Sequence, residues 1–318
     1  MTSATSPARV DPASFDWASS SGVAEGVRRV VAAATETDGR SPLNEAALLS
    51  LRHSGLSGST LWVAGPADAD LDGFALLSDS DELNLVVDPS ARGKGIGGAL
   101  AGAALKGSDG EVSAWSHGNH PAAAALAERL GLDRVRDLWV MRRSLMEPLP
   151  EVTVPTGIVV RPFEPGRDED AFLATNVEAF IDHPEQGSMT RADLEQRMAE
   201  DWFDPAGFFL AEPADAVPDG DSSVDSPPLL GFHWTKVHPG NPAYGEVYVV
   251  GVSPVAQGSG LGKALTLTGL HHLRSVGLSE VILYVESDNA PAVAVYRGLG
   301  FTHADQDTDV MYLRPARP

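Results

Sequence analysis

The sequence predicts an α/β fold, mixed α+β by some counts, built from two copies of one domain. A strand, a glycine-rich loop and the start of a helix follow one another at residues 82–106 and again at residues 246–274. Each copy then continues into a second strand, an asparagine and a second helix. The copies lie about half a chain length apart, which is too long for a solenoid repeat. Two tandem domains are the simplest account.

The composition limits the function classes. The chain has 318 residues, of which 43% are hydrophobic, and a net charge of −21, so about two domains are expected. The negative charge argues against nucleic-acid binding, which depends on Lys and Arg contacts to phosphates, and against a polybasic membrane surface. No apolar run approaches the length of a membrane span. The first residues lack the apolar core of a signal peptide, so we expect a cytoplasmic protein.

The sequence contains no motif for metal binding or for thiol chemistry. The chain contains no cysteine, which removes a disulfide framework, a thiolate metal site and a thiolate nucleophile. Its nine histidines show no H-E-x-x-H pattern, and His271 and His272 are adjacent rather than four residues apart. We therefore expect no metal, and we expect the histidines to be structural or surface residues.

The first copy begins with two helices. Apolar residues recur with helical spacing between Ser20 and Thr37, and a second helix is expected from Ser41-Pro42 to His53. Strands follow at residues 60–64, 73–77 and 82–87. The loop R-x-x-G-x-G then precedes a helix at 98–106, a strand at 111–115, Asn119-His120-Pro121 and a helix that ends at Leu130.

The proline-rich stretch EPLPEVTVPT predicts a linker. We therefore expect domains at residues 1–147 and 157–318, joined by residues 148–156. In the second domain we expect strands at 158–161, 207–211 and 229–237, and helices at 169–180 and 191–202. Residues 212–228, rich in Pro, Asp and Ser, predict a surface loop. Later strands are expected at 246–252, 280–286 and near 309–314, with a helix at 263–274.

The loop of the second copy has the pattern Q-x-x-G-x-G, formed by Gln257, Gly260 and Gly262. Glycines allow positive φ and a close backbone approach, and successive N–H groups at a helix start form an anion cradle. A pyrophosphate is the natural ligand. The loop lacks both G-K-[ST] and G-x-G-x-x-G, and taken alone it is equally consistent with an ordinary strand-to-helix turn.

The ensemble V-x-P-x-x-Q-G-S-G-L-G followed by N-x-P-A-V-x-V-Y-x-x-L-G-F resembles the GCN5-related N-acetyltransferase (GNAT) family in motif order and spacing. The resemblance implies two tandem GNAT-type domains, each with a mixed sheet that splays in the middle and is flanked by helices, and with acetyl-CoA in the gap. It assigns to the cofactor, in the second copy, Val250, Gly251, Val252, Gln257, Gly258, Ser259, Gly260, Leu261, Gly262, Lys263, Asn289, Ala290, Pro291, Ala292, Val293 and Ala294. In the first copy it assigns Leu85, Val86, Val87, Gly93, Lys94, Gly95, Ile96, Gly97 and Gly98.

Acetyl transfer to an amine needs a base, because an α-amino group with a pKa of about 7.7–8.0 is mostly protonated at pH 7. Glu246 begins the strand that leads into the phosphate loop, so we predict that it is the base. A tyrosine at the place of Tyr296 is the general acid in the family. A backbone N–H near Val250–Val252 is expected to polarise the acetyl carbonyl. Asn289 is expected to contact the pantetheine or to cap its helix.

The first copy departs from this pattern. Alignment on the two asparagines places Leu126 where the second copy has Tyr296, and leucine cannot donate a proton. Alignment on the loops places Asp81 opposite Glu246. We therefore expect the first domain to bind acetyl-CoA or to be structural, and the second to carry out the chemistry.

Further stretches resemble the mycothiol synthase family, namely LGFHWTKVHP, GEVYVVGV, HPEQG, WFDP and LYVESDN. This resemblance covers nearly the whole chain. It implies acetylation of the cysteinyl amine of Cys-GlcN-Ins, a small-molecule substrate, to form mycothiol. It also implies substrate contacts from Glu45, Glu185, Lys236, Glu246 and Tyr284. We expect a monomer.

Two other readings stay open. One is an acetyltransferase for another amine, such as a peptide N-terminus, a polyamine or an aminoglycoside, and a strongly cationic substrate would suit the net charge of −21. The other is a non-catalytic acetyl-CoA sensor. The presence of Glu246 and Tyr296 speaks against a sensor.

Overall fold

The computed structural model describes residues 6–66, 69–181, 187–215, 229–240 and 242–316. The chain forms two compact units. Unit 1 comprises Met1–Trp139 together with Ala304–Pro318, and unit 2 comprises Val140–His303. This division differs from the expected one at residues 147 and 157, because the C-terminal segment belongs to unit 1. The boundaries fall inside two long strands, β6 (Asp133–Ser144) and β12 (Thr302–Arg314).

Unit 1 contains a four-stranded antiparallel sheet in the order β1-β2-β3-β4. A further strand, β5, pairs in antiparallel fashion with the C-terminal half of β12. The elements of the unit are β1 (Ala8–Arg9), η1 (Pro12–Ser14), α1 (Gly22–Asp38), α2 (Glu45–His53), β2 (Ser59–Ala64), β3 (Gly73–Ser78), β4 (Leu83–Val87), η2 (Pro89–Ala91), α3 (Ile96–Leu105), β5 (Val112–Ser116) and α4 (Pro121–Leu130).

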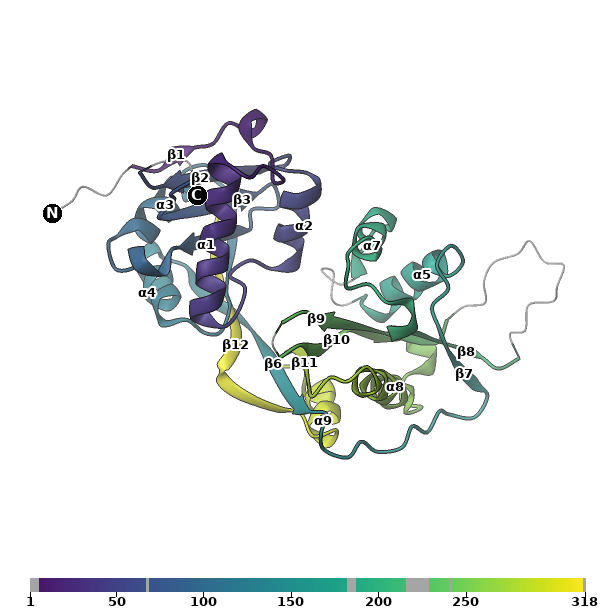
Figure 1. Ribbon diagram of the computed structural model, residues 1–318. Helices are drawn as coiled ribbons and strands as arrows, with labels where there is room; N and C mark the ends of the chain where they lie inside the picture. Colours follow the sequence, from purple (N-terminus) through teal and green to yellow (C-terminus); the bar gives the residue numbers. More distant parts are fainter. Residues whose placement is uncertain (1–5, 67–68, 182–186, 216–228, 241, 317–318) are drawn as a thin grey trace. The chain divides into compact units, whose positions relative to one another are not determined.

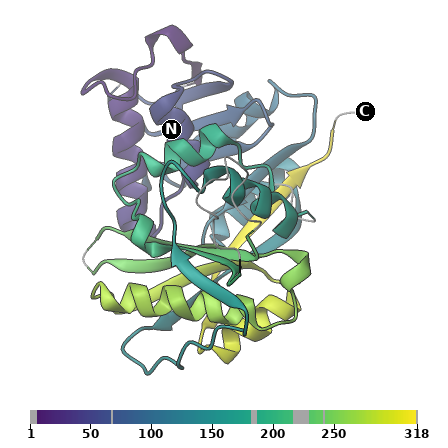
Figure 2. The same cartoon turned by 90° about the vertical axis from the view of Figure 1, so that its right-hand side faces the viewer.

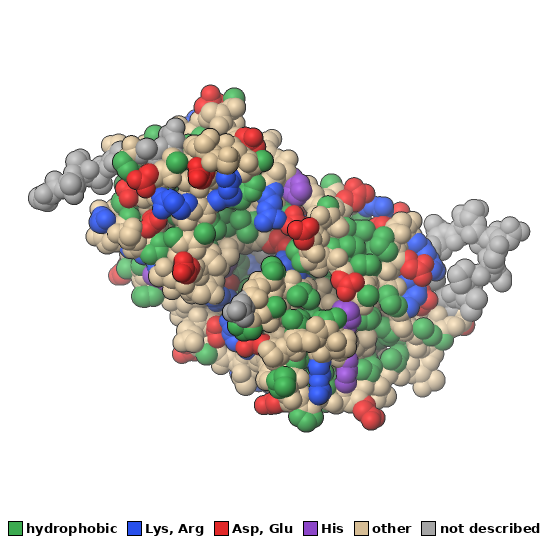
Figure 3. Space-filling view, in the orientation of Figure 1, with side chains coloured by type: hydrophobic (Ala, Val, Ile, Leu, Met, Phe, Trp, Pro, Cys, Tyr) green, Lys and Arg blue, Asp and Glu red, His purple; other side chains and the backbone are tan. Residues whose placement is uncertain are grey.

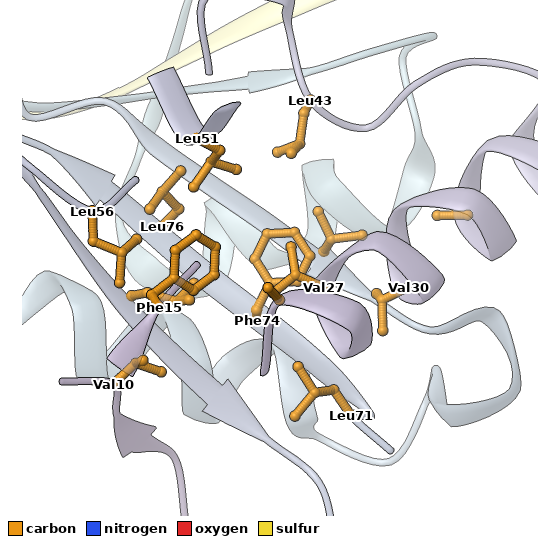
Figure 4. Packing of buried hydrophobic residues seen from close by; sticks show 14 residues of the cluster. Val10, Phe15, Val27, Val30, Leu43, Leu51, Leu56, Leu71, Phe74 and Leu76 are labelled. Atoms are coloured by element: carbon orange, nitrogen blue, oxygen red, sulfur yellow. The ribbon is translucent and has the colours of Figure 1, made fainter. Parts of the chain in front are cut away.

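The side chains of β3 alternate between two hydrophobic clusters, as the two-residue period of a strand requires. Phe74 and Leu76 pack with Val27 and Val30 of α1 (Figure 4). Ala75 and Leu77 belong to a second cluster on the other side, together with residues of α3. Helices α1 and α3 therefore cover opposite faces of the sheet, and α3 places its first turn beside the end of β4.

Unit 2 is built on a sheet in which β11, β10, β9, β8 and β7 follow one another. Apart from the parallel β10–β11 pair, the contacts among these strands are antiparallel. The elements are β7 (Ile158–Pro162), α5 (Glu169–Ala179), α7 (Arg191–Met198), η3 (Pro205–Gly207), β8 (Phe208–Pro213), β9 (Gly231–His238), β10 (Tyr244–Val252), η4 (Pro254–Ala256), α8 (Leu261–Ser275), β11 (Glu280–Glu286) and α9 (Ala290–Gly298).

The two faces of the unit 2 sheet carry different helices. Helix α8 lies along one face, and α5 and α7 lie on the other (Figures 1 and 2). Phe232 and Trp234 of β9 join Phe172 of α5 in an aromatic cluster, where Phe172 meets the Phe232 ring edge-on at 4.8 Å. His233, between them in β9, points to the opposite face and hydrogen-bonds through Nδ1 to the Leu265 carbonyl of α8.

Several expected boundaries need correction. Helix α3 begins at Ile96 rather than at residue 98, and α7 ends at Met198 rather than at residue 202. Strand β6 was not expected at all, and β12 is longer than the segment near 309–314. Residues 212 and 213 belong to β8, and most of the expected surface loop lies outside the described residues.

Candidate functional site

Strands β10 and β11 separate after a short parallel contact. Their pairs among the described residues are Gly245–Val281, Glu246–Ile282 and Val247–Leu283. Strand β10 then continues to Val252 with β9 as its partner, and the register shifts by a bulge between Val247 and Val249. The backbone edge of Val250–Val252 therefore faces the gap into which the two strands diverge, as the predicted splayed sheet requires.

The glycine loop of unit 2 follows directly. Gly258 and Gly260 adopt φ of 77° and 86°, and Gly260 is the N-cap of α8. A side chain would be strained at these angles. The Ser259 hydroxyl donates to the Ala256 carbonyl at 2.6 Å, while residues 257–260 and Lys263 are exposed. The N–H of Leu261, the first residue of α8, donates to Ser259 Oγ at 3.3 Å. The exposed glycine loop before it has a backbone geometry that suits an anion.

Unit 1 contains the same loop. Gly93 and Gly95 adopt φ of 77° and 86°, and Gly95 is the N-cap of α3. Arg92 occupies the place of Gln257 and donates two hydrogen bonds to Asp38, at 2.7 and 2.6 Å. The nearly identical angles show that the two loops have one backbone design.

A cavity of about 520 Å³ in unit 1 lies between the splayed strands and the glycine loop. Most of the residues predicted to bind a cofactor in the first copy line it, although Lys94 does not. The lining includes Leu85, Val86, Val87, Gly93, Gly95, Ile96, Gly97 and Gly98. Leu126, at the place of Tyr296, also lines the cavity.

The cavity has a basic lining, although the chain is strongly acidic and charges of both signs are interspersed on the face shown in Figure 3. Its arginine, histidine and acidic side chains are Arg40, Arg92, Arg129, His117, His120 and Asp38.

The C-terminal strand completes this cavity. Asp309 of β12 pairs with Arg40 at 2.9 Å and with His117 at 2.8 Å, and it accepts a hydrogen bond from the Gly118 N–H at 2.9 Å. Burial raises the pKa of Asp309, but these partners outweigh it and lower the pKa below its ordinary value. A residue near the end of the chain thus fixes two side chains of the cavity wall.

Unit 1 departs from unit 2 where the chemistry would occur. An isolated parallel bridge joins Glu82 and Ser113, at the place of the Val247–Leu283 pair. This match supports the alignment of Asp81 with Glu246. Asp81, however, lies in the turn before β4 with a positive φ of 56°, whereas Glu246 lies within a strand. The β3–β4 register is also free of the bulge found in unit 2.

Three predicted substrate contacts share one face of the unit 2 sheet. Glu246 is directly opposite Lys236 on β9 and Ile282 on β11, and Tyr284 follows Ile282 by two residues. Because side chains alternate along a strand, Lys236, Glu246 and Tyr284 lie on the same side. Glu45 begins α2 in unit 1, and Glu185 lies outside the described residues.

Lys236 is enclosed by aromatic rings. Its ammonium group lies 4.4 Å from the Trp202 ring centroid and 5.0 Å from that of Tyr248, within the range of cation–π attraction. The Tyr248 hydroxyl accepts a hydrogen bond from Arg197 Nε at 2.8 Å. The cage keeps a buried positive charge on the face that carries Glu246.

Glu246 is 6% exposed, and its Oε2 lies 2.5 Å from Nε2 of His238. The His238 ring stacks on Tyr244 at 4.5 Å with an interplanar angle of 11°. The expectation that all histidines are structural or surface residues therefore misses His238, which contacts the predicted base. The one sequence signal was its place at the end of a strand that precedes the Glu246 strand.

Tyr296 lies on α9, whose N-cap is Asn289. The Asn289 side chain accepts a hydrogen bond from the Ala292 N–H at 3.2 Å, so the predicted capping contact is confirmed. The Tyr296 ring meets Phe301 at 5.9 Å. Burial raises the pKa of Tyr296 to about 12, because a desolvated phenolate is unfavourable. The hydroxyl is therefore protonated at neutral pH, as a proton donor must be.

Among the described residues, no group of three or more His, Cys, Asp and Glu could hold a metal ion. No helix in that part of the chain is long and apolar enough to cross a membrane.

The model of the acetyltransferase (GNAT) family matches residues 175–301. A GCN5-related N-acetyltransferase from Sphaerobacter thermophilus superposes with a TM-score of 0.65 and 25% identity, over 93% of this chain and 94% of that one. A tandem GNAT protein from the clavulanic acid biosynthesis pathway shares the fold, with a TM-score of 0.67 and 23% identity over 91% of this chain and 94% of that one. The fold and the family model define a GNAT acetyltransferase.

Proteins with similar sequences show which GNAT acetyltransferases this chain resembles. A mycothiol acetyltransferase of Nocardioides sp. is 52% identical over 91% of this chain and 96% of its own length. One from Thermobispora bispora is 51% identical over 91% of this chain and 95% of its own. The chain belongs to the mycothiol acetyltransferase family.

Proposed function

We propose that this protein transfers the acetyl group of acetyl-CoA to the cysteinyl amine of Cys-GlcN-Ins, which forms mycothiol. The observation that carries the proposal is the identity of about one half to mycothiol acetyltransferases along almost the whole chain. The splayed strands, the glycine loop, Glu246 and Tyr296 of unit 2 support the same chemistry.

In this mechanism the chain supplies four groups. The N–H groups of the loop from Gln257 to Lys263 hold the pyrophosphate. A backbone N–H of Val250–Val252 polarises the acetyl carbonyl. Glu246 removes a proton from the substrate ammonium, and the free amine attacks the thioester carbon. Tyr296 protonates the leaving thiolate, and its hydroxyl regains a proton from the attacking nitrogen through water.

The substrate carries one ammonium and many hydroxyl groups. Carboxylates, a lysine and a phenol are suited to bind them, and we assign these contacts to Glu45, Glu185, Lys236, Glu246 and Tyr284. Lys236 and Tyr284 lie on the Glu246 face of the sheet, which supports their assignment.

We propose that unit 1 binds acetyl-CoA without turning it over. Its cavity combines the glycine loop with five basic side chains, in a chain whose net charge is −21. A local concentration of positive charge suits a polyphosphate ligand. We further expect the protein to be cytoplasmic and monomeric. Size-exclusion chromatography with light scattering would test the monomeric state.

The deciding experiment is a thiol-release assay with acetyl-CoA that compares Cys-GlcN-Ins with peptides, spermidine and an aminoglycoside. The product mass and fragmentation would distinguish N- from S-acetylation. Selective turnover of Cys-GlcN-Ins is expected. Turnover of another amine would replace the substrate but retain the mechanism, and acetyl-CoA binding without any turnover would favour a sensor.

A further inference from the structure

We propose that His238 is the positioning residue of the catalytic base. Its imidazole holds Oε2 of Glu246, so that Oε1 is directed to the substrate amine. This inference rests on the proposed function, because it takes Glu246 as the base. It assigns a role to a side chain that neither the glycine loop nor the predicted substrate contacts include.

The contact follows from the strand register. His238 is paired with Tyr244, and Lys236 is paired with Glu246, so His238 and Glu246 are diagonal neighbours on one face. The Nε2–Oε2 distance is 2.5 Å. An ionised carboxylate only accepts hydrogen bonds, so Nε2 carries the hydrogen and donates it. The contact also fixes the tautomer of the ring.

A second contact fixes the plane of the ring. His238 stacks on Tyr244, the residue directly opposite, with the rings nearly parallel. A quarter of the His238 side chain is exposed, compared with 8% for Glu246. The stack and the hydrogen bond together hold the imidazole from two directions. Supporting contacts of this kind keep a reacting group in its productive geometry.

Two other polar side chains lie on this face of the sheet. The Lys236 ammonium lies over the rings of Trp202 and Tyr248, and Tyr284 projects from β11 with 42% exposure. The 2.5 Å contact between Nε2 of His238 and Oε2 of Glu246 is the observation that places His238 to orient the carboxylate. In the base step an amine N–H bond breaks, an O–H bond forms at Oε1, and the nitrogen lone pair becomes free to attack. The Nε2–H bond of His238 stays intact throughout.

The test compares His238→Phe with His238→Gln. Phenylalanine keeps a ring against Tyr244 but has no donor, whereas glutamine keeps an N–H donor of similar reach. We expect kcat of His238→Phe to fall about 10- to 100-fold, as for a small misplacement of a reacting group, with KM for acetyl-CoA unchanged. His238→Gln should recover kcat to within a few-fold. His271→Phe removes a histidine contact to the Pro150 carbonyl and should leave kcat unchanged.

A double-mutant cycle separates positioning from general damage. In a Glu246→Gln background, His238→Phe should change kcat less than about 2-fold. Wild-type kcat in His238→Phe, an equal loss in both backgrounds, or a failure of glutamine to rescue a folded variant would overturn the inference. If the wild-type enzyme prefers another amine, the cycle is run with that amine, and the inference stands although the substrate proposal fails. If no amine is acetylated, Glu246 is no base and the inference fails with it.

Discussion

The two units share a cofactor-loop design but differ at the point where a proton must move. Both loops place glycines at φ of 77° and 86° before a helix, and both units splay two parallel strands after a matching pair. Unit 2 then has Glu246 in a strand and Tyr296 on α9, whereas unit 1 has Asp81 in a turn and Leu126. The two copies thus share the backbone of the glycine loop, while they differ at the positions proposed for the acid and the base.

The match to the family model points in the same direction, since it covers residues 175–301 and therefore lies in the second copy. A cavity lined by most of the residues predicted to bind a cofactor in the first copy lies in unit 1. Binding without catalysis in one unit and catalysis in the other is the contrast that the following predictions test.

The largest effect is expected at the acid. Tyr296→Phe should lower kcat by about 10²- to 10⁴-fold without weakening acetyl-CoA binding, because the ring remains against Phe301. Adding Leu126→Tyr restores a hydroxyl in unit 1 but no base in a strand. The double variant should therefore be as slow as Tyr296→Phe in a thiol-release assay. Recovery of turnover would show that unit 1 is competent and would break the contrast.

The base should come next. Glu246→Gln keeps the shape of the side chain but cannot accept the proton, so we expect kcat to fall by about 10²- to 10³-fold. Asp81→Asn is the matched change in unit 1, and it should leave kcat within about 2-fold. Steady-state rates with Cys-GlcN-Ins measure both. Equal losses in the two variants would mean that Asp81 takes part in the reaction.

Acid should destabilise unit 2 before unit 1. Burial lowers the pKa of His233 to about 4, so below pH 6.5 the unfolded state binds a proton that the folded state does not. Unfolding free energy should therefore fall by about 3 kcal/mol as the pH decreases from 6.5 to 4. In unit 1 the pair that corresponds to His233–Val250 is Ala75–Leu85, so no histidine is buried there. The pKa of Asp309 is lowered, and the stability that this gives to unit 1 is lost only when the pH falls below the ordinary pKa range of an aspartate.

Peptide-resolved hydrogen exchange at pH 7 and pH 4.5 would measure this difference. His233→Asn should flatten the pH dependence in unit 2, because asparagine retains a donor for the Leu265 carbonyl but does not titrate. Protection that decreases in both units alike, or that still follows pH in the variant, would assign the acid sensitivity to other groups.

The sequence was informative where local pattern determines structure. The β-branched run of β10 and the glycines before α8 predict a strand, a turn and a helix start without knowledge of the rest of the chain. The capping asparagine and the place of Tyr296 follow from the same short stretch. The alignment of the two copies on their loops and the alignment on their asparagines both agree with the Glu82–Ser113 bridge. The bridge itself could not have been predicted from a local pattern.

Long-range pairing was not visible in the sequence. Strand β6 mixes charged and apolar residues in an irregular pattern, and β12 pairs with β5 although the paired residues, such as Arg314 and Val112, are far apart in the sequence. The C-terminal segment belongs to unit 1 because of those strand pairings, which secondary-structure propensity does not reveal. His238 was missed for the same reason, because its contact with Glu246 requires the β9–β10 register.

The smallest effect concerns the glycine of the unit 1 loop. Gly95→Ala places a Cβ at a φ of 86°, which costs about 1–2 kcal/mol and displaces the N–H groups at the start of α3. Gly102 is the matched control, since it lies inside the same helix with no atom within 4 Å of an added Cβ. Gly102→Ala should raise stability by up to about 1 kcal/mol.

Isothermal titration should show two acetyl-CoA sites in Gly102→Ala and a single tight site in Gly95→Ala, with kcat retained in both. If Gly95→Ala kept both sites, ligand binding in unit 1 would not depend on its loop; if it lost turnover, the two units would not divide binding from catalysis.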